Sequence, residues 1–286
     1  MNHSESRTIC RAVTLSIALI LCVQSGLFAF QESIVPLKRA HAHNDYQHKR
    51  PLLDALERGF CSAEADVFLV DGELLVAHTK FWLHRERTLE SMYLKPLHEL
   101  AQNNNGQIFK NQTFTLLIDF KEKGNEIYPV LKKQLEKYRS SFSGFTNGKY
   151  KKSAIQIVIS GSRPKKLIIN DNDRLVGIDG RPSELDSDLP AEVMPLISDQ
   201  WSSQFKWRGR GEFPENYQKK LKSIGQRAHK KGRRVRFWAT PEKEAVWQVL
   251  LDADVDLINT DKLDELKNFL LKSDAKKNRT KKSETK

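Results

Sequence analysis

Cysteine is scarce in this sequence. The 286 residues contain three cysteines, and Cys10 and Cys22 lie in an apolar segment near the N-terminus. Only Cys61 remains in the rest of the chain, so no internal disulfide can form there. One cysteine also excludes the paired spacings of zinc fingers. Stability must come from a packed core, for which an apolar share of 39% is sufficient.

Long apolar runs are missing as well, except over residues 12–30. Arg7 and Arg11 precede this run, and a basic flank before a short apolar region is typical of a secretory signal. The run is also long enough to span a bilayer if it is not cleaved. We therefore expect a signal peptide or signal anchor over residues 1–30. Either one predicts an extracytoplasmic protein, secreted or periplasmic, or tethered to a membrane.

Acidic residues are too few to balance the basic ones, and the formal net charge is +12. Residues 276–286 contribute six Lys or Arg and one Glu. We expect residues 274–286 to form a solvated, basic disordered tail. Its charge leaves open an attraction to anionic membrane surfaces. The chain carries no groove-reading motif and no aromatic-rich platform for single strands, which argues against a specific nucleic-acid partner.

Strand-like and helix-like segments alternate along the rest of the chain. This alternation predicts an α/β fold, a (β/α)₈ TIM barrel that fills a single domain over residues 31–273. The eight predicted strands are Lys38–Ala42, Ser62–Val70, Phe114–Phe120, Ala154–Ser160, Arg174–Ile178, Met194–Ser198, Arg233–Ala239 and Val255–Thr260. The predicted helices are Pro51–Arg58, Pro96–Gln102, Glu126–Ser140, Phe213–Lys231, Pro241–Leu251 and Lys262–Leu271.

Two connections depart from this alternation. Asp71 and Gly72 form a tight-turn signal, so residues 73–77 should fold back as a hairpin strand. Residues 179–193 are too polar and rich in proline for a good helix.

Chemistry in a TIM barrel gathers at the carboxyl ends of its strands. Glu64 and Asp66 lie two residues apart in one predicted strand and therefore face the same side. Asp119 lies near the end of the next predicted barrel strand. Three carboxylates at one mouth repel each other unless a cation lies between them, and oxygen ligands suit Mg²⁺ or Ca²⁺. We interpret Glu64, Asp66 and Asp119 as metal ligands.

Two histidines bracket the carboxylate pair. His43 and His78 are candidates for a general acid and a general base, and Asn44 and Asp45 for orienting an imidazole or binding substrate. Lys121 can take a phosphate charge. Trp201, Trp207 and Trp238 are candidates for an apolar wall around a substrate, and Trp238 is the one we assign to substrate binding.

These motifs resemble the glycerophosphodiester phosphodiesterase family, within the phospholipase C-like phosphodiesterase barrels. The resemblance rests on His-Asn-Asp, Glu-x-Asp and D-G-E-L-L-V-A-H, and on the later I-D-F-K, R-F-W-A-T and I-N-T-D. The opening H-A-H-N-D-Y is most similar to the branch related to the yeast altered inheritance of mitochondria proteins. The resemblance implies catalytic His43 and His78 and metal ligands Glu64, Asp66 and Asp119.

Several positions depart from the usual family pattern. Asn44 and Asp45 stand where the family has Arg-Gly, and the usual Glu-Asn-Thr is replaced by residues 49–52. Asp119 stands in place of Glu, and Thr79 in place of the Asp that commonly follows the second histidine. These departures weaken the expectation of glycerol specificity more than that of phosphodiester hydrolysis.

The sequence thus predicts a metal-dependent phosphoric diester hydrolase that acts on a glycerophosphodiester or phospholipid-type substrate. It leaves open whether water or a substrate hydroxyl attacks phosphorus. A metal-dependent amidohydrolase also begins with His-x-His, but it needs histidines at the ends of strands five and six, where this chain has none. The alternative outside enzymes is a decayed barrel that binds a phospho-ligand or an anionic surface.

Overall fold

A computed structural model describes residues 34–284, so the predicted leader lies outside the described part of the chain. Residues Pro36–Lys286 form one compact unit. Among residues 34–284, no helix is both long and apolar enough to cross a membrane.

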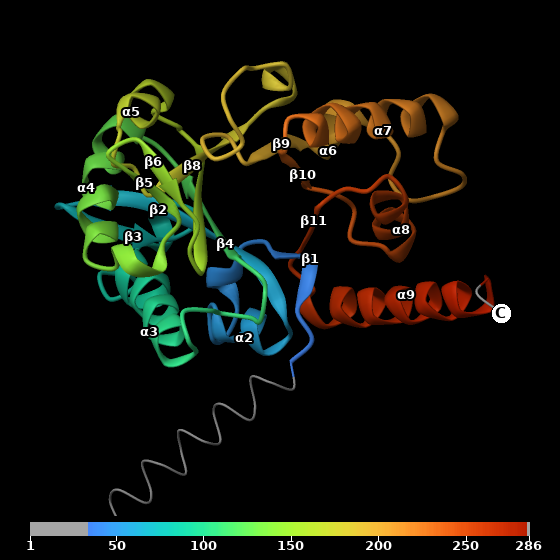
Figure 1. Ribbon diagram of the computed structural model, residues 1–286, viewed down its shortest axis with the longest axis horizontal. Coiled ribbons are helices and arrows are strands. Elements are labelled where there is room, and N and C mark those ends of the chain that lie inside the picture. Colours follow the sequence, from blue (N-terminus) through green and yellow to red (C-terminus); the bar gives the residue numbers. More distant parts are fainter. Residues whose placement is uncertain (1–33, 285–286) are drawn as a thin grey trace, which may run out of the picture. The chain divides into compact units, whose positions relative to one another are not determined.

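Eight parallel strands close into a barrel, because β1 pairs with β2 on one side and with β11 on the other. Helices lie outside these strands (Figure 1). The predicted (β/α)₈ TIM barrel is confirmed, and each strand lies within two residues of its predicted bounds. The strands are β1 (Leu37–Ala42), β2 (Phe60–Val70), β4 (Phe114–Phe120), β7 (Ile155–Gly161), β8 (Val176–Gly180), β9 (Leu196–Gln200), β10 (Arg234–Trp238) and β11 (Leu257–Thr260).

Three further strands lie outside the barrel ring. The predicted hairpin is present: β3 (Glu73–Val76) pairs antiparallel with β2. Its turn places Asp71 at φ 50° and Gly72 at φ 84°, the positive values that a tight two-residue turn needs. The second hairpin, β5 (Gly144–Thr146) with β6 (Lys149–Lys151), is not anticipated by the sequence pattern.

The six predicted helices are present in the predicted order, and α5 and α6 are additional to them. The α-helices are α2 (Leu53–Glu57), α3 (Lys95–Asn103), α4 (Gly124–Glu136), α5 (Lys165–Asn170), α6 (Trp201–Gln204), α7 (Glu215–Lys230), α8 (Glu244–Asp252) and α9 (Leu263–Glu284). Shorter turns are the 3₁₀ helices η1 (Asp45–Gln47), η2 (Lys80–Trp82), η4 (Arg139–Ser141) and η5 (Pro182–Glu184), and the π-helical η3 (Glu90–Leu94). Between β8 and β9 the chain forms only η5, as its polar, proline-rich sequence predicts.

The C-terminal helix differs from expectation. The sequence predicts that helix to end at residue 271 and a disordered tail to begin at 274, whereas α9 continues to Glu284. Residues 263–284 contain neither glycine nor proline and are rich in Leu, Lys and Glu, which favour helix. Positive charge alone therefore does not prevent helix formation here.

The barrel interior combines an apolar layer with charged groups. Leu117, Val158, Leu196 and Leu257 are fully or almost fully buried and form one cluster. The strand register pairs Leu117 with Glu64, so the apolar cluster and the buried carboxylate lie at the same level of the barrel interior. The carboxyl ends of β2, β4 and β7 lie beyond this level of the interior.

Trp201 occupies a different place from the one expected. It is 2% exposed and packs against Phe205, Phe213 and Phe237, with ring centroids 4.5 to 6.0 Å away. Its indole Nε1 donates to the Trp207 carbonyl at 2.8 Å. Trp201 thus belongs to the core between β9, β10 and α7, and the expectation that it lines a substrate wall is wrong.

Candidate active site

The strand register sets the predicted carboxylates at one end of the barrel. Asp66 of β2 is level with Asp119 of β4, and Asp119 is level with Ser160 of β7. Asp119 and Ser160 lie one residue before the carboxyl ends of β4 and β7, and Asp66 lies one residue before Val67, the last β2 residue that pairs with β4. TIM barrels carry their active sites at this end. Glu64 lies two residues earlier on β2, one level deeper.

Asp66 is the centre of the site. Its Oδ2 atom lies 2.7 Å from the Tyr46 hydroxyl, 3.0 Å from His78 Nδ1 and 3.1 Å from Lys121 Nζ. Its Oδ1 atom is buried and has no hydrogen-bond partner among the residues that the structure describes. Burial and the charge of Glu64 raise the pKa of Asp66, although the Lys121 ammonium acts in the opposite direction.

Asp119 shares the Lys121 ammonium with Asp66. The Lys121 Nζ atom lies 3.2 Å from Asp119 Oδ2 and therefore bridges the two carboxylates. Burial, together with the charges of Asp66 and Glu64, raises the pKa of Asp119 to about 6. The two carboxylates are thus in an environment that lacks positive charge, even with Lys121 beside them.

Glu64 belongs to a second, fully buried network. Its Oε2 atom accepts from the Arg236 guanidinium and lies 3.2 Å from His41 Nε2. Burial opposes ionisation of Glu64, but the Arg236 charge and the His41 contact outweigh it and lower its pKa. Burial and Arg236 lower the pKa of His41 to about 4, so this imidazole is neutral. Its Nδ1 atom lies 2.7 Å from Ser62 Oγ, which fixes the ring.

His43 is oriented by the end of β11. Its Nδ1 atom lies 2.8 Å from Asp261 Oδ1, so the carboxylate accepts the Nδ1 proton and Nε2 stays free for chemistry. Burial alone would lower the pKa of His43, but the Asp261 hydrogen bond and the Glu64 charge raise it overall. Asn44 Nδ2 also donates to Asp261, at 3.3 Å, from a residue in the left-handed region at φ 46°.

Tyr46 joins the two predicted histidines. Its hydroxyl oxygen lies 2.7 Å from Asn44 Oδ1 and 3.1 Å from His78 Nδ1, in addition to Asp66. Contacts within hydrogen-bond distance therefore lead from Asp261 and His43 through Asn44 and Tyr46 to His78, Asp66, Lys121 and Asp119. The single Tyr46 proton is donated to one of Asn44 Oδ1 and Asp66 Oδ2 at a time.

His78 faces a cavity beside this network. Its side chain is 53% exposed, and it lines a cavity of about 430 Å³ together with Tyr46, Trp82, His84 and Arg87. Because Nδ1 is held by Asp66 and Tyr46, Nε2 is the ring atom available to a bound molecule. The cavity is large enough for a small phosphodiester group.

Two predicted substrate-binding residues, Asp45 and Trp238, lie in different surroundings. Asp45 is fully buried, and its Oδ2 atom accepts from the Leu52 backbone N–H and from the Tyr93 hydroxyl. Asp45 therefore holds the loop after β1 from beneath and does not face the cavity, contrary to a role in substrate contact. Trp238 is half-buried at the carboxyl end of β10, level with Gln200.

A divalent cation was expected at the three carboxylates. Among residues 34–284, no three His, Cys, Asp or Glu side chains are gathered into a ready coordination set. Glu64 is paired with Arg236 instead. Asp66 and Asp119 nevertheless fit such an ion: both are short of positive charge, and Asp66 offers an unpaired buried oxygen. For Glu64 to bind the same ion, its ion pair with Arg236 would have to break.

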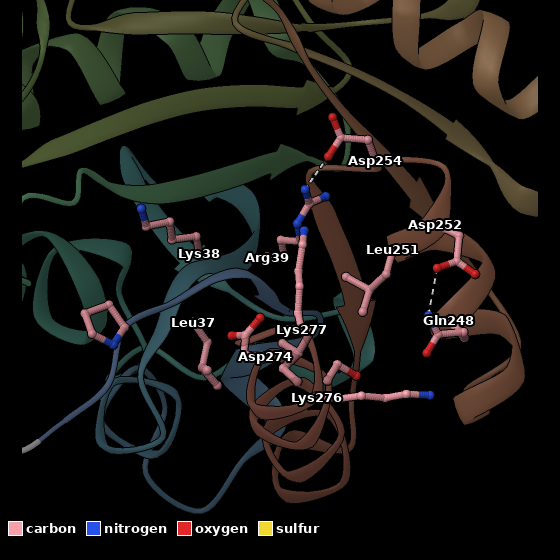
Figure 2. A pocket seen from close by; sticks show the side chains of 13 residues that line it. Leu37, Lys38, Arg39, Gln248, Leu251, Asp252, Asp254, Asp274, Lys276 and Lys277 are labelled. Atoms are coloured by element: carbon pink, nitrogen blue, oxygen red, sulfur yellow. Dashed lines mark hydrogen bonds and ion pairs between the residues drawn. The ribbon is translucent and has the colours of Figure 1, made fainter. Parts of the chain in front are cut away.

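A larger cavity lies at the opposite end of the barrel. It has a volume of about 600 Å³ and lies between the start of β1, the end of α8 and α9. Figure 2 shows Arg39 paired with Asp254 and Gln248 with Asp252 along its wall. In a TIM barrel this end contributes to stability, so the site at the carboxyl ends is the better candidate.

Comparison with known proteins identifies the family. The AIM6-like phosphodiesterase domain matches residues 28–179, just over half of the chain. The chain belongs to this family of phosphodiesterase domains. The glycerophosphoryl diester phosphodiesterase family matches residues 234–264, which hold β10 and β11. The resemblance inferred from the sequence motifs is thus confirmed.

Curated relatives span most of both chains. The altered inheritance of mitochondria protein 6 of Saccharomyces cerevisiae strain S288c is 28% identical, over 85% of this chain and 73% of that protein. Its counterpart in Eremothecium gossypii is 26% identical, over 86% and 73%. A solved glycerophosphodiester phosphodiesterase from Parabacteroides distasonis has a TM-score of 0.48 and 14% identity, over 82% of this chain and 97% of that one.

Three residues of the site carry no predicted role. Tyr46, Arg236 and Asp261 each contact a predicted residue directly. A signal for Arg236 was present, since two arginines at i and i+2 inside an apolar strand require buried acceptors. Asp261 directly follows β11, a position at a strand end like that of Asp119. Tyr46 had no such signal, because Asn-Asp-Tyr also suits an ordinary turn.

Proposed function

We propose that this chain is a divalent-cation-dependent phosphodiester hydrolase that acts on a glycerophosphodiester or phospholipid-type substrate. The observation that carries the proposal is the network of contacts within hydrogen-bond distance that joins His43 and His78 to Asp66 at the barrel mouth. Two imidazoles with free Nε2 atoms, beside carboxylates and an ammonium, form a site for acid–base chemistry on an anionic substrate.

The two histidines take different roles in this proposal. His43 has a raised pKa and a carboxylate behind Nδ1, which favours the protonated ring and suits the general acid that protonates the leaving alcohol. His78 is more exposed and is held at Nδ1 by Asp66, which directs Nε2 to accept a proton from the attacking hydroxyl. Tyr46 keeps both rings in register through Asn44 and Asp66.

The proposed cofactor is Mg²⁺ or Ca²⁺. Asp66 and Asp119 would hold it, with Glu64 as a third ligand if its contact with Arg236 is released. When bound, such an ion neutralises non-bridging phosphate oxygens. The Lys121 ammonium, which now bridges the two carboxylates, would then be free to face the phosphate.

Substrate contacts outside the reacting groups are proposed for Asn44 and Trp238. Asn44 is adjacent to His43 and is fixed by Tyr46 and Asp261. Trp238 ends β10 at the same mouth and presents a half-buried indole ring. Asp45 is not among these contacts.

A second candidate function rests on Arg236. Its guanidinium already neutralises Glu64 in the barrel interior, and this pairing is compatible with a barrel that binds a phospho-ligand without turnover. Binding of inorganic phosphate or a phosphodiester with no hydrolysis under any cation would favour this candidate over the enzyme.

The proposed location is extracytoplasmic, in the secreted or periplasmic space or tethered by the leader. The support is the basic and then apolar sequence over residues 7–30. The basic residues over 276–286 support an additional attraction to anionic membranes.

Single substitutions of the histidines test the proposed enzyme. His43→Ala and His78→Ala should each lower kcat on an aryl phosphodiester by roughly 100- to 10,000-fold. His98→Ala is the matched control, because His98 lies on α3 and contacts Ser141 outside the network. Unchanged kcat in the first two variants would refute the assignment of the acid and the base.

A further inference from the structure

The segment after His78 presents two adjacent aromatic side chains to solvent. Phe81 is 87% exposed and Trp82 is 62% exposed, and both belong to the 3₁₀ helix η2. Their rings contact each other edge to face, with centroids 5.5 Å apart. The other exposed large hydrophobic side chains of residues 34–284 are less exposed and are single aliphatic residues: Val35, Leu53 and Leu167. Single exposed hydrophobic side chains are normal on a protein surface, whereas two adjacent exposed aromatic rings indicate an interaction site. We call Phe81 and Trp82 the aromatic tip.

The tip lies beside two residues of the candidate active site, His78 and Tyr46. Trp82 lines the same cavity of about 430 Å³ as His78 and Tyr46. One side of the loop therefore faces the cavity, while Phe81 extends into solvent. A partner that covers Phe81 would be brought next to the mouth of the barrel.

The charged residues within the loop itself are mainly basic. Residues 79–88 contain Lys80, Arg85 and Arg87 against the single Glu86. Lys80 pairs with Glu122 and Arg85 with Asp71, yet these basic side chains remain 64% and 73% exposed. Aromatic rings flanked by exposed cations are the combination that favours the headgroup region of a bilayer, where anionic lipids attract Lys and Arg.

From these observations we infer that the Phe81–Trp82 loop docks on the surface of a phospholipid bilayer containing anionic lipid, so that the cavity receives a membrane-resident phosphodiester. The aromatic rings enter the interfacial region while Lys80 and Arg85 meet lipid phosphates. The docking itself is independent of turnover. The choice of a lipid phosphodiester as substrate rests on the function proposed above.

Vesicle binding tests the docking separately from catalysis. The test protein begins at residue 34, which retains the compact unit of residues 36–286 with its complete barrel. Cosedimentation with vesicles of phosphatidylcholine and phosphatidylserine should detect binding, and Phe81→Ser should weaken it by on the order of tenfold through lost apolar burial. Phe81→Leu, which keeps an apolar side chain, should retain most of the binding. Leu167→Ser, which removes an exposed apolar residue on α5, should leave it unchanged.

A second readout locates the loop in the bilayer. Brominated phosphatidylcholine quenches the fluorescence of tryptophans that enter the bilayer. We expect stronger quenching in the unsubstituted protein than in Trp82→Phe, a variant that keeps an aromatic ring at this position. Equal quenching in the two proteins, or equal vesicle binding by Phe81→Ser and the unsubstituted chain, would overturn the docking proposal.

Turnover distinguishes the two proposals. Phe81→Ser should hydrolyse a soluble aryl phosphodiester at the unsubstituted rate and show a raised KM for a phosphodiester lipid in vesicles. Vesicle binding without any turnover would support the docking and contradict the enzyme. Turnover of the soluble substrate without binding to vesicles would support the enzyme and contradict the docking.

Discussion

The hydroxyl oxygen of Tyr46 lies 2.7 Å from Oδ2 of Asp66, and this contact links the loop after β1 to the carboxylate at the centre of the site. The same hydroxyl lies within hydrogen-bond distance of His78 and Asn44. One phenol thus supports the orientation of both candidate catalytic histidines.

Tyr46→Phe should therefore lower kcat by roughly 10- to 100-fold, by loosening Asn44 and His78 while preserving the packing of the ring. Steady-state kinetics on an aryl phosphodiester measures the effect. The control is Tyr138→Phe, which removes a hydroxyl bonded to Glu90 far along the chain from these residues. Equal kcat in both variants would show that Tyr46 is not part of the working site.

Arg236 should matter for stability as well as for the site. Arg236→Met leaves the buried Glu64 carboxylate without its main counter-charge and should lower the free energy of unfolding by roughly 3–5 kcal/mol. Arg39→Met removes a partly exposed pair with Asp254 and should cost less than about 1 kcal/mol. Urea unfolding of both variants measures the difference. Similar small losses would contradict a buried ionic network in the barrel interior.

Asp45 should give the fold a recognisable pH dependence. Burial raises its pKa from the ordinary 3.8 to about 6, against the opposing hydrogen bonds from Leu52 and Tyr93. The folded state then keeps a proton that the unfolded state has released. The contribution of Asp45 to the free energy of unfolding is largest below about pH 4 and falls by about 3 kcal/mol as the pH rises to about 6.

Asp45→Asn cannot titrate, so its unfolding free energy should lack this decrease between about pH 4 and about pH 6. The informative quantity is the difference in slope between the variant and the unsubstituted chain, because other carboxyls titrate in both. Parallel curves would show that Asp45 has an ordinary pKa in the folded protein.

Cys61 should be chemically inert in the folded chain. It is 5% exposed, and burial raises the pKa of its thiol to about 12. Iodoacetamide should therefore label a chain that begins at residue 34 only at the rate at which the barrel opens, and quickly in urea. Rapid labelling without denaturant would contradict the placement of Cys61 in the core at the start of β2.

The strand order and the placement of the carboxylates followed from the sequence because both depend on local pattern. Apolar runs separated by helices predict a barrel, and residues at strand ends such as Asp66 and Asp119 then fall at one mouth. Helix α9 was underestimated because its basic residues were interpreted as disordered, although they are good helix formers.

The side-chain partners could not be predicted in the same way. Arg236 meets Glu64 across 172 positions of sequence, and only barrel closure sets that pairing. Lys121 was expected to face a phosphate, yet it lies between Asp66 and Asp119, because two carboxylates at one level attract the cation nearest to them. Asp45 was misjudged because a turn residue on a tight loop can point inward as easily as outward.

The dependence of turnover on a divalent cation is the most direct test of the central claim. The chain from residue 34 would be treated with EDTA and assayed on glycerophosphodiesters, lysophospholipids and an aryl phosphodiester, before and after addition of Mg²⁺ or Ca²⁺. Our account predicts turnover that disappears with the chelator, returns with one of these ions, and is lost in Glu64→Ala and His43→Ala. Turnover that persists in EDTA, or folded protein that hydrolyses none of these phosphodiesters with either ion, would contradict it.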